Sequence, residues 1–429
     1  MIFTRLSKAS STSSALALAM ILGATGTAAT VALEQPAFAQ KKKKDDKADA
    51  KKYSDGFIAV YQPIAAQVNG DAPDWTAIAA QRPAVVAAVE TDDDRMIAGN
   101  LIYSMGSNLE NRELQLEGVE LMLASGKVAP ESLGQYNLLA GQLAYNFDQY
   151  PKARTYLMKA VELGAIESQP EGLIAESYFS EENYKAGLDY LASAIAAREA
   201  AGEPVNEQWV RRGLQMSYNN QMKAELNDFA QLFIKHFPTQ QNWGEVVAIT
   251  AYGGGWQNPE ILDLMRLARD ADALRDERMY ADYIDSADYR RLPGEVAAVI
   301  NEGYTKGTLK RTDTYVSEIF GMATDRAKTD RADLSGILTG ARGASDLRTV
   351  MTGADLALSY GDYAAAETLY TKALGLAGVN SDLAHTRLGI AQLEQGKSAE
   401  AIESFNAVAG QRAAIAKLWA IYAEQQGGM

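Results

Sequence analysis

A spacing of about 34 residues recurs along this chain and restricts its fold more than any other feature. The clearest match lies near the C-terminus, where four positions recur at an offset of 35 residues: Ala354 and Gly389, Gly361 and Gly396, Ala366 and Ala401, Tyr370 and Phe405. Four positions nearer the N-terminus recur at 34 residues: Gly141 and Ala175, Tyr150 and Tyr184, Leu157 and Leu191, Ala160 and Ala194. A period of this length is typical of stacked helical hairpins, each of which buries its apolar face on its neighbours.

The residue types at these positions fit two antiparallel helices joined by a turn. Small residues mark the close contact within a hairpin: Gly141, Ala175, Ala354 and Gly389. Tyrosines are expected to open second helices: Tyr150, Tyr184 and Tyr363. Breakers stand where turns are expected: Asp148, Gly361 and Gly396. The sequence therefore predicts helical hairpins at both ends of the repeat region.

The middle of the chain repeats less regularly. Trp209 recurs as Trp243 and Pro259 as Pro293, again 34 residues apart, and both prolines are placed to start second helices. Residues 313–326 and 330–342 are expected to form a further helix pair with a break near Thr329.

The string GDYAAAETLYTKAL, residues 361–374, resembles the tetratricopeptide repeat family, as does the segment from Leu388 to Phe405. The resemblance is strong over 134–200 and 347–414, weaker over 205–310 and loose over 92–128. His385 stands where the family has its early tryptophan in the last repeat, and Trp209 is a match. The resemblance implies an all-α fold, a right-handed superhelical solenoid of stacked antiparallel hairpins.

Five segments follow from these patterns. We expect a signal peptide at 1–39, a charged linker and leading helix at 40–73, and N-terminal repeats at 74–240. Degenerate helical repeats are expected at 241–345 and C-terminal repeats at 346–429.

The N-terminal segment predicts export. Arg5 and Lys8 precede an apolar stretch that ends in the small-x-small motif Ala37-Phe38-Ala39, so we expect cleavage after Ala39. The stretch is weakly apolar for a permanent span, and an uncleaved N-terminal anchor is the alternative. The predicted location is the periplasm of a Gram-negative bacterium, with no stable membrane span after cleavage.

Composition excludes several classes of site. The chain has no cysteine, which excludes disulfides, thiolate metal sites and a lipidated N-terminal cysteine. The formal charge is −14, which argues against nucleic-acid binding because phosphate contacts need clustered Lys and Arg. The one basic cluster, Lys41, Lys42, Lys43 and Lys44, is read as a solvated leader, with a weak tether to an anionic surface as the alternative.

No constellation of catalytic or metal-binding residues stands out, so we expect no enzyme activity, cofactor or metal. The two histidines, His236 and His385, lie far apart in sequence and lack metal-ligand spacing. Residues 92–94 are three aspartates read as helix capping. The acidic residues at 270, 272, 276 and 277 alternate with arginines and are read as ion pairs on a solvated helix face. Residues 253–255 are three glycines that fall on a hairpin turn and lack a phosphate-loop signature.

The function expected is that of a non-enzymatic scaffold that holds a protein or peptide on its concave helical surface. The family resemblance implies ligand contacts from first-helix positions: Gln142, Tyr145, Asn146, Glu176, Phe179, Ser180, Asp355, Leu358 and Ser359. The aromatic and leucine members of this set have packing between units as an alternative role. A glycan-binding or polysaccharide-export accessory role, supported by 21 tyrosines and five tryptophans, and an enzyme built on a helical toroid are the alternative functions.

Overall fold

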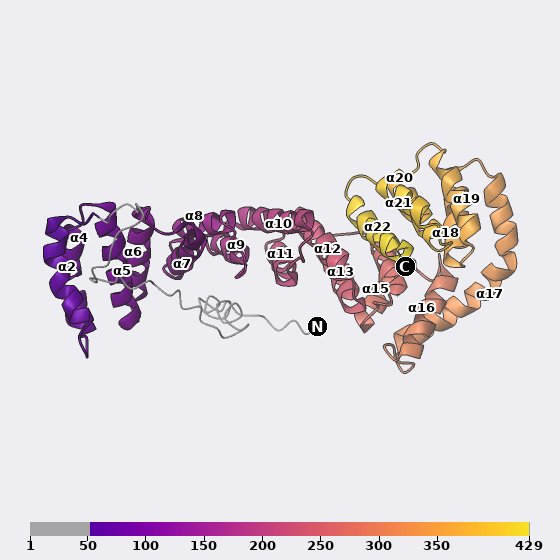
Figure 1. The fold of residues 1–429 in the computed structure, drawn as a ribbon. Helices are drawn as coiled ribbons and strands as arrows, with labels where there is room; N and C mark the ends of the chain where they lie inside the picture. The colour runs from indigo at the N-terminus through magenta and orange to yellow at the C-terminus, as the bar shows by residue number, and fades with distance from the viewer. Residues whose placement is uncertain (1–51, 429) are drawn as a thin grey trace. The chain divides into compact units, whose positions relative to one another are not determined.

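The structure is a computed structural model that describes residues 52–428. Within these residues every regular element is a helix, and the chain divides into two compact units after Tyr136, inside α7 (Figure 1). The predicted all-α class and the stacking of antiparallel hairpins are confirmed. The signal segment, its cleavage after Ala39 and the tether Lys41, Lys42, Lys43 and Lys44 lie outside the described residues.

The first unit is built around one helical hairpin. Its elements are α2 Asp55–Val68, α3 Trp75–Ala79, α4 Arg82–Ala87, α5 Asp92–Asn108, α6 Arg112–Ala124 and the short η1 Pro130–Ser132. The backbones of α5 and α6 touch, since a Cβ on Gly99 would lie 2.6 Å from the carbonyl oxygen of Gly118. Thr91 and Asp94 form a capping box at the start of α5, which confirms the capping role predicted for residues 92–94. Phe57, Ile102 and Met105 belong to the core beneath α2.

The second unit continues with helices that pack in chain order. They are α7 Leu133–Asn146, α8 Tyr150–Glu162, α9 Pro170–Ser180, α10 Tyr184–Ala201, α11 Glu207–Asn219, α12 Lys223–His236, α13 Gln240–Gly253, α14 Asn258–Asp270, α15 Glu277–Ala287, α16 Pro293–Lys306, α17 Thr314–Gly343, α18 Leu347–Ser359, α19 Tyr363–Leu374, α20 Ser381–Leu393, α21 Ser398–Asn406 and α22 Ala413–Gly427. The three predicted tyrosines begin α8, α10 and α19, and the two prolines stand in the first turns of α14 and α16.

Glycine allows the two helices of a hairpin to approach each other closely, as the spacing predicted. A Cβ on Gly141 would lie 2.5 Å from Cγ of Leu157, and one on Gly389 would lie 2.5 Å from Cε1 of Phe405. Gly213, in the less regular middle, is in an equivalent position, since a Cβ on it would lie 2.2 Å from Cδ1 of Phe229. A single mode of contact therefore links regular and degenerate repeats.

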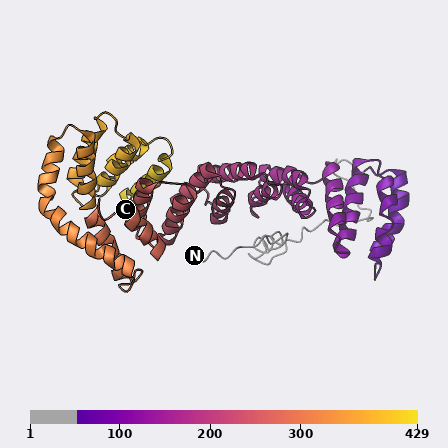
Figure 2. The same cartoon turned by 180° about the vertical axis from the view of Figure 1, so that it is seen from behind.

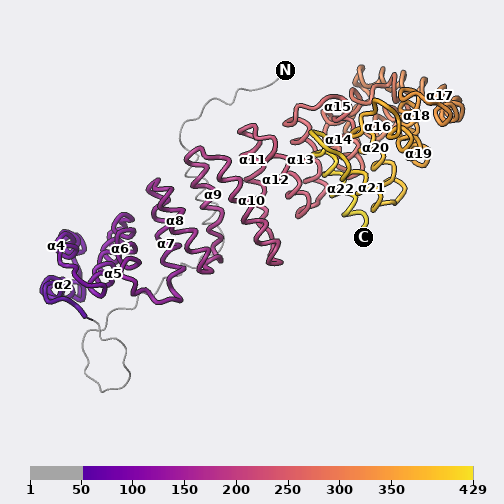
Figure 3. The backbone as a smooth tube through the Cα atoms, turned by 90° about the horizontal axis from the view of Figure 1, so that it is seen from above, coloured from indigo at the N-terminus to yellow at the C-terminus, as the bar shows by residue number. Residues whose placement is uncertain are grey.

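Two regions of the second unit differ in their environment. We call α7–α12 the open hairpins, because each contacts mainly its neighbours in sequence, and they follow one another in chain order in Figure 3. We call α13–α22 the closed region, because its last helix packs against α12, α14 and α20. Figures 1 and 2 both place α22, in yellow, beside the middle helices of the chain.

The helix pair predicted for residues 313–342 is wrong. These residues form one helix, α17, with no break near Thr329. Threonine lowers helix propensity only slightly and neither glycine nor proline stands at that point, so the helix continues. Gly321, Gly336 and Gly340 lie within α17 with open space around them.

Within residues 52–428, no helix is both long enough and apolar enough to span a membrane.

Candidate functional site

One position recurs in successive first helices and carries an aromatic side chain each time. It lies three residues before the turn residue with positive φ, which is Asp148, Glu182, Gln221 or Gly255. In the first three hairpins its carbonyl accepts a hydrogen bond from the N–H of that turn residue. We call these four residues the aromatic row: Tyr145, Phe179, Tyr218 and Tyr252.

Members of the aromatic row contact the next first helix along the stack. Tyr145 Oη lies 3.4 Å from Ser180 Oγ in α9, and Tyr252 Oη donates to Asp282 in α15 at 2.9 Å. Burial, the bond to Asp282 and that carboxylate's charge raise the pKa of Tyr252 to about 12. Tyr218 is 46% exposed and is the most accessible member. The row therefore links helices while leaving aromatic surface open.

Ion pairs flank the aromatic row and also join first helices. Arg212 in α11 holds Glu176 of α9 through two hydrogen bonds, of 2.6 and 2.8 Å. Arg211 donates to Glu245 of α13 at 3.0 Å. A bidentate pair fixes both side chains in one geometry. In Figure 1, α7, α9 and α11 lie on one side of the stack and α8 and α10 on the other. We call this side the first-helix face.

The predicted contact residues are divided between this face and the core. Gln142, Asn146 and Ser180 are exposed, whereas Phe179 is buried against Gly187. Glu176 is half-buried and held by Arg212.

The predicted residues of the C-terminal repeats have internal partners. Asp355 accepts hydrogen bonds from Arg387 and Tyr370, each at 2.7 Å. Ser359 donates to the carbonyl of Leu356, and Leu358 is buried. These residues do not join the first-helix face of the open hairpins.

Sequence reasoning missed Tyr218 because the repeat register shifts before α11. The turn residues Asp148 and Glu182 are 34 apart, whereas Glu182 and Gln221 are 39 apart (221 − 182). α10 is 18 residues long, and a loop follows it. The 34-residue offset between Tyr218 and Tyr252 was the available signal.

A second site lies where α14, near the start of the closed region, contacts α20 and α22 at its end. The carboxylate of Asp263 in α14 is fully buried and accepts hydrogen bonds from Arg266, Arg387 and Arg412. The indole of Trp419 in α22 donates to the carbonyl of Asp263 at 3.0 Å. Residues up to 149 positions apart therefore meet at one carboxylate.

The buried charges extend from Asp263 in two directions. Arg266 donates twice to Glu295 of α16 at 2.7 Å, and Tyr283 donates to the same carboxylate. On the other side, Arg387 continues to Asp355. Each of the three buried arginines therefore has two carboxylate partners: Arg266 has Asp263 and Glu295, Arg387 has Asp263 and Asp355, and Arg412 has Asp263 and Glu260.

The arrangement shifts the pKa values of its carboxyl groups in opposite directions. Burial favours the neutral form of Asp263, but the charges of Arg387, Arg412 and Arg266 outweigh it and hold the pKa below its usual value. Asp270, further along α14, has no such cluster. Burial and the neighbouring Glu394 carboxyl raise the pKa of Asp270 well above its usual value. The interpretation of Asp270 as part of a solvated ion-paired face is therefore wrong, although Asp272 does pair with Lys306.

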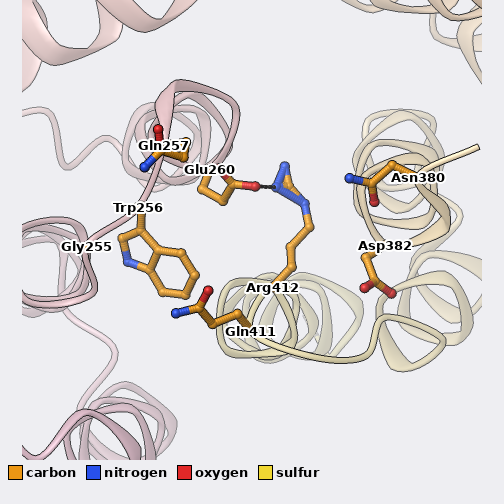
Figure 4. A pocket seen from close by; sticks show the side chains of 8 residues that line it. All are labelled: Gly255, Trp256, Gln257, Glu260, Asn380, Asp382, Gln411 and Arg412. Carbon is orange, nitrogen blue, oxygen red and sulfur yellow. Dashed lines mark hydrogen bonds and ion pairs between the residues drawn. The ribbon is translucent and has the colours of Figure 1, made fainter.

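A pocket of about 290 Å³ opens beside this network. Its lining comes from the α13–α14 turn, the start of α20 and the segment before α22: Gly255, Trp256, Gln257, Glu260, Asn380, Asp382, Gln411 and Arg412. Figure 4 shows Trp256 and Glu260 on one side, Asn380 and Asp382 on the other, and Gln411 and Arg412 between them. Polar side chains dominate the lining, with one large aromatic ring.

Gly254 and Gly255 lie in the α13–α14 turn, as predicted, whereas Gly253 is the last residue of α13; the turn glycines make room for Trp256. A Cβ on Gly254 would lie 1.9 Å from the indole nitrogen, which donates to the carbonyl of Thr250 at 2.8 Å. Gly255 has a φ of 70°, a conformation that glycine adopts without strain.

Neither site brings together a nucleophile and a base in the manner of an enzyme. His236 ends α12 and its Nε2 lies 2.7 Å from Glu199, so its contact is with a surface carboxylate. In the described part of the chain, no group of three or more histidine or acidic side chains is arranged to hold a metal ion.

No family model matches the sequence, and a search of curated proteins finds no match. Solved structures with a similar arrangement of helices include the complex described as Naa15/Naa10 bound to HypK-THB. That match is 13% identical, with a TM-score of 0.38, and covers 82% of this chain and 57% of the other. The match to yeast Tom70 is 12% identical, with a TM-score of 0.20, and covers 86% of this chain and 96% of the other. The tetratricopeptide-like fold rests on the hairpin geometry described above.

Proposed function

We propose that this chain is an exported, non-enzymatic scaffold that binds a polypeptide partner along the first-helix face of the open hairpins. The aromatic row is the observation that carries the proposal. Three of its four aromatic residues, Tyr145, Phe179 and Tyr218, lie at equivalent positions on successive first helices of the open hairpins, and ion pairs hold the helices beside them. Aromatic side chains contribute much of the energy at protein interfaces because they bury large areas with few rotatable bonds.

The contrast with the closed region supports this choice of surface. There, Asp355 is bonded to Arg387 and Tyr370, and α22 packs against α12 and α14. A partner entering that region would have to displace buried ion pairs, which costs several kcal/mol, on the order of 3–5. The open hairpins carry no such packing on Tyr218, so binding there leaves the fold intact.

Site-specific photo-crosslinking in the producing cell tests the surface. A photoreactive phenylalanine analogue replaces Tyr218 in one variant and Met158 in the other. Met158 is the matched control because it is 37% exposed and lies on the second helix α8. We expect a discrete crosslinked polypeptide from position 218 and none from position 158.

Binding of the identified partner is then measured with Tyr218→Ala. Loss of this anchor should weaken affinity about tenfold or more, with the helical content unchanged. Crosslinks that form equally at both positions, or only at Met158, would place the interface elsewhere.

Export rests on the N-terminal sequence and has its own test. Mass spectrometry of the chain from a fractionated Gram-negative host should show a periplasmic form that begins at Gln40. An intact N-terminus in the membrane fraction would instead support the anchored form.

A further inference from the structure

We infer that the pocket between α14, α20 and α22 binds a single neutral sugar ring. The inference goes beyond the partner-binding function, because the pocket and the aromatic row share no residue. Three observations carry it: a fixed aromatic ring, a set of polar groups that both donate and accept, and a buried donor without a partner.

The indole of Trp256 is held in place before any ligand arrives. Its N–H is bonded to the carbonyl of Thr250, and its ring lies over the backbone of Gly254. Trp256 is also half-exposed, whereas Trp209, Trp243 and Trp419 are buried. A pre-positioned ring offers apolar contact to the C–H face of a sugar without loss of side-chain entropy on binding.

The polar groups around the ring have unused hydrogen-bonding capacity. Asp382 accepts from the N–H of Ala409 through Oδ1, which leaves Oδ2 available. Asn380 uses its oxygen to cap α20, which leaves its amide donors available. Gln411 is exposed and has no side-chain hydrogen bond within residues 52–428. Sugar hydroxyls donate and accept at once, so they need this mixture of acceptors and donors.

Arg412 supplies the buried donor. Its terminal nitrogens are bonded to Glu260, Asp263 and the carbonyl of Pro259, but its Nε–H has no partner among the described residues. The side chain is 5% exposed and lines the pocket. A buried donor without an acceptor costs free energy, and an approaching hydroxyl oxygen would recover it.

Charge and size restrict the ligand class. Glu260 and Asp382 outnumber the single cation Arg412, which disfavours phosphates and acidic sugars. The volume of 290 Å³ is just below the usual range for ligand pockets, about 300–1,000 Å³, which suits one ring. A lysine side chain is the main competitor, since it also favours an indole beside carboxylates.

Saturation-transfer NMR on the purified full chain distinguishes these ligands. The probes are the methyl glycosides of glucose, galactose and N-acetylglucosamine, with glucuronic acid and Nα-acetyl-lysine amide as competitors. We expect transfer to the ring C–H protons of at least one neutral glycoside and little to glucuronic acid. No transfer to any neutral glycoside, or tighter binding of the lysine amide, would overturn the inference.

Three variants connect binding to the pocket. Trp256→Ala should reduce glycoside affinity about tenfold or more, and Trp256→Phe should retain most of it. Gln411→Ala removes an exposed amide that supports no other residue, so a loss of about threefold or more there cannot come from misfolding. Met158→Ala, at an exposed position on α8, is the control and should leave glycoside affinity unchanged. Equal affinity in wild type, Trp256→Ala and Gln411→Ala would exclude this pocket.

Discussion

The open hairpins and the closed region are built from the same helical unit but use charge differently. In the open hairpins, Glu176 and Arg212 pair on the surface with side chains 18% and 35% exposed. In the closed region, Asp263 and Arg387 are 0% and 2% exposed. The surface pair leaves the first-helix face accessible, whereas the buried pairs fill the space that a partner would need. One repeat type therefore provides an accessible helical face in one region and a self-supporting core in the other.

The largest expected effect comes from removing the buried carboxylate. Asp263→Ala leaves Arg387 and Arg412 buried with one partner fewer, so we expect a loss of about 3–5 kcal/mol in the closed region. Hydrogen exchange should rise in α14, α20 and α22 and remain unchanged in α8 and α10. Asp189→Asn, which removes an exposed pair with Lys185, is the control and should leave hydrogen exchange in both regions unchanged. An equal rise in both regions would contradict the distinction.

Replacing a glycine at a close contact within a hairpin should lower the free energy of unfolding by a similar amount in both regions. Gly213→Ala and Gly389→Ala each place a Cβ against a buried phenylalanine ring, at 2.2 and 2.5 Å, so we expect each to cost about 1–3 kcal/mol. Gly336→Ala in α17 meets open space and should instead stabilise by up to about 1 kcal/mol. Urea unfolding followed by circular dichroism checks all three. A cost at Gly389 alone would mean that packing, as well as charge, separates the regions.

The closed region should also show a distinct pH dependence. Asp270 has a folded-state pKa raised above its ordinary value of 3.8, so it binds a proton more tightly when folded. Its contribution to stability therefore decreases as pH rises above about 3.8, by at most about 1.4 kcal/mol per pH unit. Asp270→Asn removes this decrease, and its advantage over wild type should increase as the pH is raised from 4 toward the folded-state pKa of Asp270. The lowered pKa of Asp263 has the opposite sign, since its contribution is lost only as pH falls below 3.8. A constant difference across that range would show that Asp270 is not perturbed.

The smallest effect on stability is expected at the first-helix face. Glu176→Gln removes a partly exposed ion pair with Arg212, so unfolding should change by about 0–1 kcal/mol. Partner affinity should fall more than stability does, because Arg212 loses the contact that orients it beside Phe179. Thermal unfolding and partner titration on the same preparation separate the two quantities. A large loss of stability would mean that this pair supports the fold.

The sequence predicted local features well and distant contacts poorly. The glycines at 141 and 389, the tyrosines that begin α8, α10 and α19, and the turn at 254–255 all follow from short-range sterics. The partners of Asp263 lie 124 and 149 residues away, and no periodic pattern indicates that an aspartate and two arginines so distant will meet. The five extra residues before Gln221 likewise hid the place of Tyr218 in the aromatic row. The continuity of α17 was missed because a threonine was taken for a break.

The docking of α22 sets an order for biosynthesis. Hairpins made of neighbouring helices can form as soon as both helices have left the ribosome or the export channel, because their contacts are local. The carboxylate of Asp263 cannot bond to Arg412 until another 149 residues have been synthesised. The carbonyl of Ile234 cannot accept its hydrogen bond from Gln425 until another 191 residues have been synthesised. The closed region is therefore the last part to mature, and a chain interrupted before α22 would retain its early hairpins while Asp263 lacked two of its partners, Arg412 and Trp419.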